Sequence, residues 1–189
     1  MIRVAALLGL CAVLTAFLLS MIWGHQQARN NGAEIILDME PVDPRSLFRG
    51  HYVIIRTPLN RIDTDDVPDH PPFKAGDKIF VSLAPANETK PTEENKEKWI
   101  VTALSKHLPT DSDVFIQGRV SRNSERNDNG TTYRIQYNIE SYFADKVSAL
   151  ALEKKVEESK MRVILAVDEN GKAVIRGLEI DGTRFIDEL

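Results

Sequence analysis

The residues with the greatest potential for chemistry lie between positions 40 and 57, in the sequence EPVDPRSLFRGHYVIIRT. Arg45, Arg49 and His51 bring three nitrogen-rich side chains into seven residues, and a guanidinium presents a planar fork of donors that suits a carboxylate or a phosphate. Binding of an anionic group is therefore one interpretation of this stretch. The simpler interpretation is pairing with nearby acidic residues, among them Asp43, which is two positions from Arg45.

A second group of potential ligands is the acidic stretch 63–69, with the sequence DTDDVPD. Its carboxylates are hard oxygen donors of the kind that calcium prefers, but the stretch lacks the loop glycine and terminal glutamate of an EF-hand. We therefore favour a solvated loop and keep calcium as the alternative. The four histidines show no i, i+2 or i, i+4 metal spacing, so we expect no metal and no cofactor.

The sequence shows no catalytic constellation. It contains no G-x-S-x-G elbow, P-loop or dinucleotide fingerprint, and its one cysteine lies in an apolar run. The nearest pattern is 38–41, Asp-Met-Glu-Pro, which is similar to the S-M-x-P of signal peptidases but has Asp38 at the nucleophile position. A carboxylate there does not perform Ser/Lys acyl transfer. We predict that the chain is not an enzyme; the alternative is a peptidase-like membrane protein without activity.

Composition excludes two further classes of protein. The 24 Lys and Arg residues against 28 Asp and Glu give a net charge of -4, which would not neutralise a run of phosphates, so we expect no nucleic-acid partner. A single cysteine excludes a disulfide framework and a multi-thiol zinc domain.

The N-terminal segment predicts a membrane anchor. Residues 4–23 are free of charge, and as a helix they span about 30 Å, the thickness of a bilayer hydrocarbon core. A cleaved signal peptide has a shorter apolar region of about 7–15 residues and then small residues at the cleavage site. Here the run leads into Trp23, an aromatic residue suited to the membrane interface. We therefore predict an uncleaved transmembrane anchor over residues 1–24 and a polar linker over 25–31.

The flanking charges suggest an orientation. Arg3 and the amino group precede the run and Arg29 follows it, which is a small bias towards a cytoplasmic N-terminus. A three-residue N-terminal tail and a large acidic domain also suit this arrangement. We expect a single-pass protein of the inner, cytoplasmic membrane, with its C-terminal domain in the periplasm or outside the cell.

The remainder, residues 32–189, is predicted to be a β-rich domain because short β-branched and alternating segments are separated by turn signals. A barrel or sandwich of about eight strands with one flanking helix fits these segments. The helix is expected at 145–159, and 60–72 contains too many Asp and Pro residues for any regular element. Strands are expected over 34–39, 52–57, 78–84, 99–104, 113–122, 131–139, 160–167 and 172–180, with a short addition after 180.

The sequence also predicts two strand pairings and the role of one glycine. The strands 113–122 and 131–139 are predicted to pair, and Gly118 between alternating residues indicates a bulge or a close backbone approach. The strands 160–167 and 172–180 flank Asn170-Gly171, a pair that supplies the positive-φ residues of a tight hairpin turn.

The stretch from 40 to 57 resembles the signature region of the GDYXXLXY family of bacterial membrane-anchored proteins. In that region an apolar strand leads into P-V-D-P-R, then R-G-D-Y and a second strand. Residues 41–45, Arg49-Gly50 and Tyr52 match this pattern, whereas His51, Ile55 and Thr57 replace its Asp, Leu and last Tyr.

A second block supports the resemblance, since 137–143, YNIESYF, is similar to the family's Y-G-I-E-x-Y-F. The resemblance implies one transmembrane helix and an extracytoplasmic domain with no established enzymatic activity. It also implies a role beside a multi-spanning membrane protein, and hence a non-enzymatic accessory or partner-binding module. The candidate partner-binding or signature residues are Asp43, Arg45, Arg49, Gly50, His51, Tyr52, Tyr137, Glu140 and Tyr142.

Overall fold

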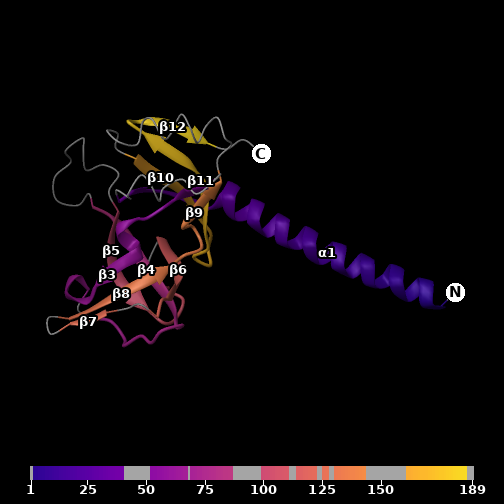
Figure 1. Cartoon of the computed structure of the whole chain (residues 1–189), viewed down its shortest axis with the longest axis horizontal. Helices are drawn as coiled ribbons and strands as arrows, with labels where there is room; N and C mark the ends of the chain where they lie inside the picture. Colours follow the sequence, from indigo (N-terminus) through magenta and orange to yellow (C-terminus); the bar gives the residue numbers. More distant parts are fainter. Residues whose placement is uncertain are drawn as a thin grey trace.

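The computed structural model of the chain describes residues 2–40, 52–67, 69–86, 99–110, 114–122, 125–127, 130–143 and 161–186. These residues form one long helix followed by a mainly β domain (Figure 1). The predicted fold class is confirmed, with twelve strands in the described residues rather than about eight. The difference arises from three-residue strands, which are too short to show alternation in the sequence. The predicted helix at 145–159 lies outside the described residues.

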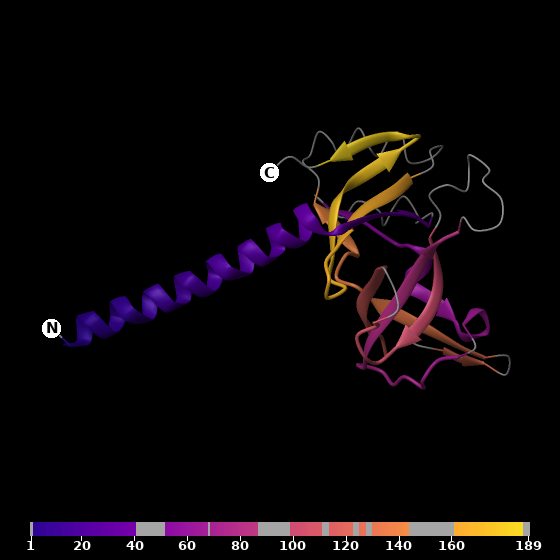
Figure 2. The same cartoon turned by 180° about the vertical axis from the view of Figure 1, so that it is seen from behind.

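The first element is α1 (Ile2–Asn31), which projects from the domain (Figures 1 and 2). The large apolar side chains between Val4 and Trp23 are each more than half exposed, from 53% for Leu14 to 74% for Trp23. Among the described residues, this helix alone is long and apolar enough to cross a membrane. The residues expected to form a polar linker, 25–31, are the last two turns of the same helix.

A four-stranded antiparallel sheet follows, with the strand order β1-β10-β11-β12. Its strands are β1 (Ala33–Asp38), β10 (Met161–Val167), β11 (Ala173–Ile180) and β12 (Thr183–Ile186). Ile35 pairs with Leu165, so the first strand of the domain lies beside a strand about 130 residues later in the chain.

A six-stranded sheet has the order β3-β8-β6-β4-β5, and β7 pairs with β8. Its strands are β3 (Arg61–Asp63), β4 (Lys78–Pro85), β5 (Trp99–Ser105), β6 (Val114–Val120), β7 (Glu125–Asn127) and β8 (Gly130–Gln136). The predicted pairing of β6 with β8 is confirmed at Val120 and Ile135, although β7 lies between them in the chain.

The expectation that 60–72 contains no regular element is wrong. Two 3-10 turns, η1 (Pro58–Asn60) and η2 (Thr64–Asp66), flank β3 in this region. Ile62 is buried opposite Tyr133 of β8, so this one apolar side chain packs into the core although its neighbours are polar. Tertiary packing of a three-residue strand thus overrides a sequence rich in turn formers.

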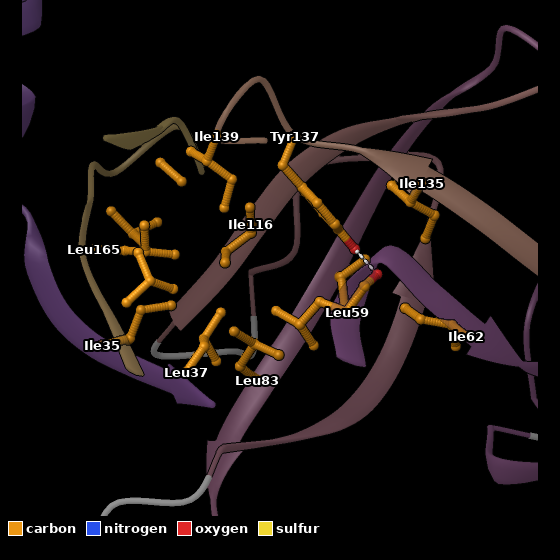
Figure 3. Close-up of a cluster of buried hydrophobic side chains, with 14 of the residues drawn as sticks. Ile35, Leu37, Leu59, Ile62, Leu83, Ile116, Ile135, Tyr137, Ile139 and Leu165 are labelled. Carbon is orange, nitrogen blue, oxygen red and sulfur yellow. Dashed lines mark hydrogen bonds between the residues drawn. The ribbon is translucent and has the colours of Figure 1, made fainter. Parts of the chain in front are cut away.

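A third pair of strands, β2 (Tyr52–Ile54) and β9 (Ser141–Phe143), is antiparallel. The two larger sheets share one core, to which β1 and β10 contribute Ile35, Leu37 and Leu165, and the other sheet contributes Leu83 and Ile116 (Figure 3).

The turns differ from the expectation. In the turn between β10 and β11, Gly171 has a φ of +80°, whereas Asn170 is not among the residues with positive φ. The N–H of Gly171 donates to the carbonyl of Asp168 over 2.9 Å, so one glycine is sufficient to close this longer loop. The tight two-residue turn with two positive φ values is instead Asp181-Gly182, between β11 and β12.

The prediction of a close approach at Gly118 is confirmed. A Cβ atom there would lie 2.5 Å from Cγ2 of Ile135 and 2.9 Å from the ring of Tyr137. Glycine therefore gives the Tyr137 ring room to lie over β6.

Candidate functional site

The structure describes four of the nine candidate residues. Asp43, Arg45, Arg49, Gly50 and His51 lie outside the described residues. The backbone of Tyr52 begins β2. Tyr137 directly follows β8, Glu140 directly precedes β9, and Tyr142 lies in β9.

Pairing of β2 with β9 brings the two signature blocks side by side. Tyr52 is opposite Phe143 and Val53 is opposite Tyr142. The pairing continues where the N–H of Ile55 donates to the carbonyl of Glu140 over 3.0 Å. The two blocks, about 85 residues apart in the chain, therefore form one structural unit.

The carboxylate of Glu140 stabilises the turn that leads into β9. Its Oε1 accepts a 2.6 Å hydrogen bond from the N–H of Tyr137 and a 3.5 Å contact from the side-chain amide of Asn60. The side-chain amide of Asn60 also donates to the backbone carbonyl of Ile135 over 3.1 Å, and its side-chain oxygen Oδ1 accepts from the N–H of Thr57 over 2.9 Å. Since Thr57 is fully buried, this network ties the end of the first block to the second block inside the protein.

Tyr137 is the centre of the same region. Its side chain is 3% exposed, and its hydroxyl donates a 2.8 Å hydrogen bond to the carbonyl of Leu59 (Figure 3). Burial, and then the nearby carboxylate of Glu140, raise the pKa of Tyr137 well above the ordinary value for tyrosine.

We expect the raised pKa of Tyr137 to make the fold sensitive to alkali. Unfolded Tyr137 loses its proton near pH 10, whereas folded Tyr137 keeps it, so the full contribution is present below about pH 10. Above this pH the free energy of unfolding should fall by about 1 kcal/mol per pH unit until the folded pKa is reached. Urea unfolding from pH 8 to 11 measures the slope. Tyr137→Phe should remove this part of it, and an identical slope in that variant would contradict the assignment.

The backbone conformation of residue 138, directly after Tyr137, explains why the family pattern has glycine there. Asn138 stands where the family pattern has glycine, and its φ is +62°. Asparagine is one of the few residues other than glycine that adopts this left-handed conformation readily. The substitution therefore keeps the turn that presents Glu140 to the N–H of Tyr137.

The acidic stretch 63–69 contributes to the contacts between strands. The side chain of Asp63 accepts a hydrogen bond from the hydroxyl of Thr132, which joins β3 to β8. In the part of the chain that the structure describes, no three His, Cys, Asp or Glu side chains come close enough to hold a metal ion. Asp38, at the nucleophile position of the peptidase-like pattern, is exposed at the end of β1.

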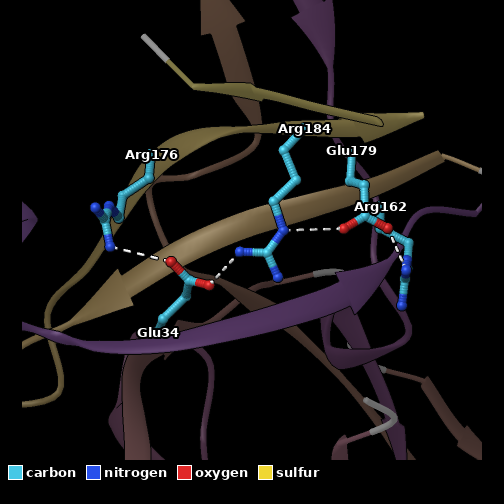
Figure 4. Close-up of polar contacts among 5 residues, drawn as sticks. All are labelled: Glu34, Arg162, Arg176, Glu179 and Arg184. Atoms are coloured by element: carbon cyan, nitrogen blue, oxygen red, sulfur yellow. Dashed lines mark hydrogen bonds and ion pairs between the residues drawn. The ribbon is translucent and has the colours of Figure 1, made fainter. Parts of the chain in front are cut away.

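The sequence did not reveal a second polar cluster, which crosses the four-stranded sheet (Figure 4). Glu34 accepts from Arg176 over 3.0 Å and from Arg184 over 2.9 Å. Glu179, whose side chain is 4% exposed, pairs with Arg162 and lies 3.4 Å from Nε of Arg184. The five residues come from β1, β10, β11 and β12, and only the pairing of these strands brings them together. Each of these contacts joins a guanidinium to a carboxylate of the chain, so the arrangement stabilises the sheet.

The residues around Tyr137 and Glu140, and the charged cluster on the four-stranded sheet, make hydrogen bonds and ion pairs within the domain. Glu140 and Tyr137 hold backbone groups, and Glu179 holds two guanidinium groups. Among the described residues, the candidates from the second block therefore stabilise a framework that consists of β2, η1 and β9. Asn60 and Thr57, which complete the framework, were missed because nothing in their local sequence indicates a contact with residues 135–140.

Neither the curated proteins nor the solved structures include a match to the chain. The family model described as GDYXXLXY protein matches residues 14–178, a range that includes both signature blocks and most of the β domain. The chain therefore belongs to the GDYXXLXY protein family.

Proposed function

We propose that this chain is a single-pass membrane protein whose β domain binds another membrane protein, as a non-enzymatic accessory module of a membrane complex. The observation that carries the proposal is the uncovered apolar surface of α1, whose window of highest hydropathy has no buried residues. Contact of apolar surface with water costs about 25 cal/mol per Å². The β domain does not bury this apolar surface of α1. A bilayer, or a bilayer together with the helices of a partner, would remove it from water.

The proposed location is the inner membrane, with the β domain in the periplasm or outside the cell. Support comes from the short N-terminal tail, which carries Arg3 beside the amino group. The partner is proposed to be a multi-spanning protein of the same membrane.

The proposed partner-binding surface is the segment that leads into β2, with Arg45, Arg49 and Tyr52. Arginine and tyrosine are over-represented among the residues that dominate binding energy at interfaces. Support from the structure comes from β9, where the buried side chain of Tyr142 anchors the strand that pairs with β2. A rigid support of this kind limits the entropy lost when a partner binds the adjoining segment.

Photo-crosslinking in intact cells tests this proposal. A photoreactive amino acid is placed at Arg49 or Tyr52 of the full chain, and at Asp65 as a control, since Asp65 is exposed in η2. We expect a discrete adduct with a membrane protein from Arg49 and Tyr52 only. Absence of an adduct at both positions, or the same adduct from Asp65, would contradict the proposed surface.

We also expect the mature protein to keep α1. Ala28 and Arg29, in the last turn of the helix, are 2% and 9% exposed, so the end of the helix is part of the folded domain. The intact mass of the protein from membranes should correspond to a chain that includes the whole apolar run, and alkaline carbonate should not extract it. A mature N-terminus after Trp23 would show that the run is a cleaved signal.

A further inference from the structure

The helix α1 extends beyond its apolar part. The last apolar residue of the run is Trp23, and helix continues to Asn31, which adds eight polar or small residues. Eight residues of helix are about 12 Å long. If Trp23 lies at the membrane interface, this extension crosses the headgroup layer as a rigid stalk.

The stalk ends against the last residue of β10. The N–H of Gly32 donates to the carbonyl of Ala28 over 3.0 Å, and a Cβ at Gly32 would lie 2.8 Å from the backbone nitrogen of Val167. Because Val167 directly precedes Asp168, the turn between β10 and β11 begins at the helix. Figures 1 and 2 both show this hairpin beside the domain end of α1.

The turn has a fixed position in the domain. The carbonyl of Gly171 accepts a 2.7 Å hydrogen bond from the N–H of Gln117 in β6, and a Cβ at Gly171 would lie 2.8 Å from the ring of Phe115. These contacts bury Gly171, whereas Glu169, Asn170 and Lys172 remain exposed.

Both strands that the turn joins, β10 and β11, contact α1. Lys172 acts electrostatically on the imidazole of His25, which is two residues after Trp23 and one turn before the buried Ala28. The ammonium of Lys172 is therefore near the part of the stalk that follows Trp23.

We propose that the turn between β10 and β11 lies in the phospholipid headgroup layer of the membrane that holds α1. The ammonium of Lys172 contacts a headgroup phosphate, and the carboxylate of Glu169 faces a headgroup ammonium. These opposite charges fit a zwitterionic lipid such as phosphatidylethanolamine, and an acidic domain gains nothing from an anionic surface. The inference rests on the proposed membrane anchoring, and it adds a second contact that fixes the orientation of the domain on the bilayer.

Fluorescence quenching in liposomes tests the inference without any partner protein. The full chain, with Cys11→Ser, carries an environment-sensitive fluorophore on Asn170→Cys or, as a control, on Asp65→Cys. Asp65 follows β3, which lies at the end of the domain remote from α1 in both views. The vesicles contain phosphatidylethanolamine, phosphatidylcholine and a lipid with a quencher on its headgroup.

We expect quenching at position 170 to be several-fold stronger than at position 65, and to fall when Lys172→Gln is added. Equal, weak quenching at both positions would overturn the inference. Flotation of the vesicles confirms insertion of α1 separately, so failure of the hairpin contact is distinguishable from failure of the anchor. Thermal melting of each variant confirms that the domain is folded, and unchanged quenching in folded Lys172→Gln would overturn the role of the ammonium.

Discussion

Replacement of Tyr137 by alanine is expected to lower the free energy of unfolding by about 3–5 kcal/mol, the usual cost of removing a fully buried aromatic ring. The ring is 3% exposed and lies over Gly118, so its loss leaves a cavity between β6 and β8. The hydroxyl is a separate contribution, because the carbonyl of Leu59 loses its 2.8 Å hydrogen bond. Tyr137→Phe removes only that bond and should cost about 1–3 kcal/mol.

Urea unfolding of the full chain in mild detergent measures both costs. Trp99 packs against the core, and in a Trp23→Phe background it is the sole tryptophan reporter. Tyr133→Phe is the matched control, since Tyr133 is also buried but its hydroxyl makes a longer contact, accepting from the N–H of Phe73 over 3.3 Å. A loss at Tyr133→Phe equal to that at Tyr137→Phe would show that the 2.8 Å bond has no special role.

The double substitution of Arg162 and Arg184 by methionine is expected to cost about 3–5 kcal/mol, because it leaves the carboxylate of Glu179 buried without the two guanidinium groups that surround it. Addition of Glu179→Met to this background should recover most of the loss, since an apolar group replaces the uncompensated charge. The triple variant thus separates the cost of an unpaired charge from the cost of lost packing.

Arg176→Met is the matched control on the same sheet. Its partner, Glu34, has a side chain that is 33% exposed, so the loss of this pair should cost less than about 1 kcal/mol. Urea unfolding of these three variants and of the unchanged protein tests the scheme. A triple variant as unstable as the double variant would mean that packing of the arginine stems, rather than burial of Glu179, accounts for the loss.

Stability measurements of this kind distinguish two roles for the residues of the family signature, namely stabilising the fold and binding a partner. Tyr137, Glu140 and Tyr142 make buried contacts that hold β2, η1 and β9 together. Their substitution should act through stability. Arg49 is proposed to act through binding, so its substitution should weaken crosslinking to the partner while the urea midpoint is unchanged.

Most of the longer elements could be predicted from the sequence. The segments that became β1, β4, β5, β6, β8, β10 and β11 have enough β-branched or alternating residues to be recognised alone. The apolar run was recognised for the same reason, because its 20 uncharged residues suit a bilayer in any tertiary context. Of the short strands, β2 and β12 were also expected, whereas β3, β7 and β9 were missed. A three-residue strand such as β3 depends on the partner that buries Ile62.

The two hairpin turns show where the local sequence predicts the backbone conformation and where tertiary contacts change it. The sequence Asn170-Gly171 predicted a tight turn, but Gly171 alone adopts a positive φ, since its carbonyl is held by Gln117 of the other sheet. In Asp181-Gly182 both residues adopt a positive φ, which is the two-residue form that the dipeptide favours.

Residue type and spacing along the chain were sufficient to predict the long apolar N-terminal segment, the β-rich class and the family. Tertiary structure alone decided that the two signature blocks meet at β2 and β9, and that Glu140 holds Tyr137 and Asn60. It also decided that five charged residues form one network across the four-stranded sheet. The physical reason is the same in each case: these contacts join residues far apart in the chain, and their energies are realised only once burial and strand pairing have brought the partners together.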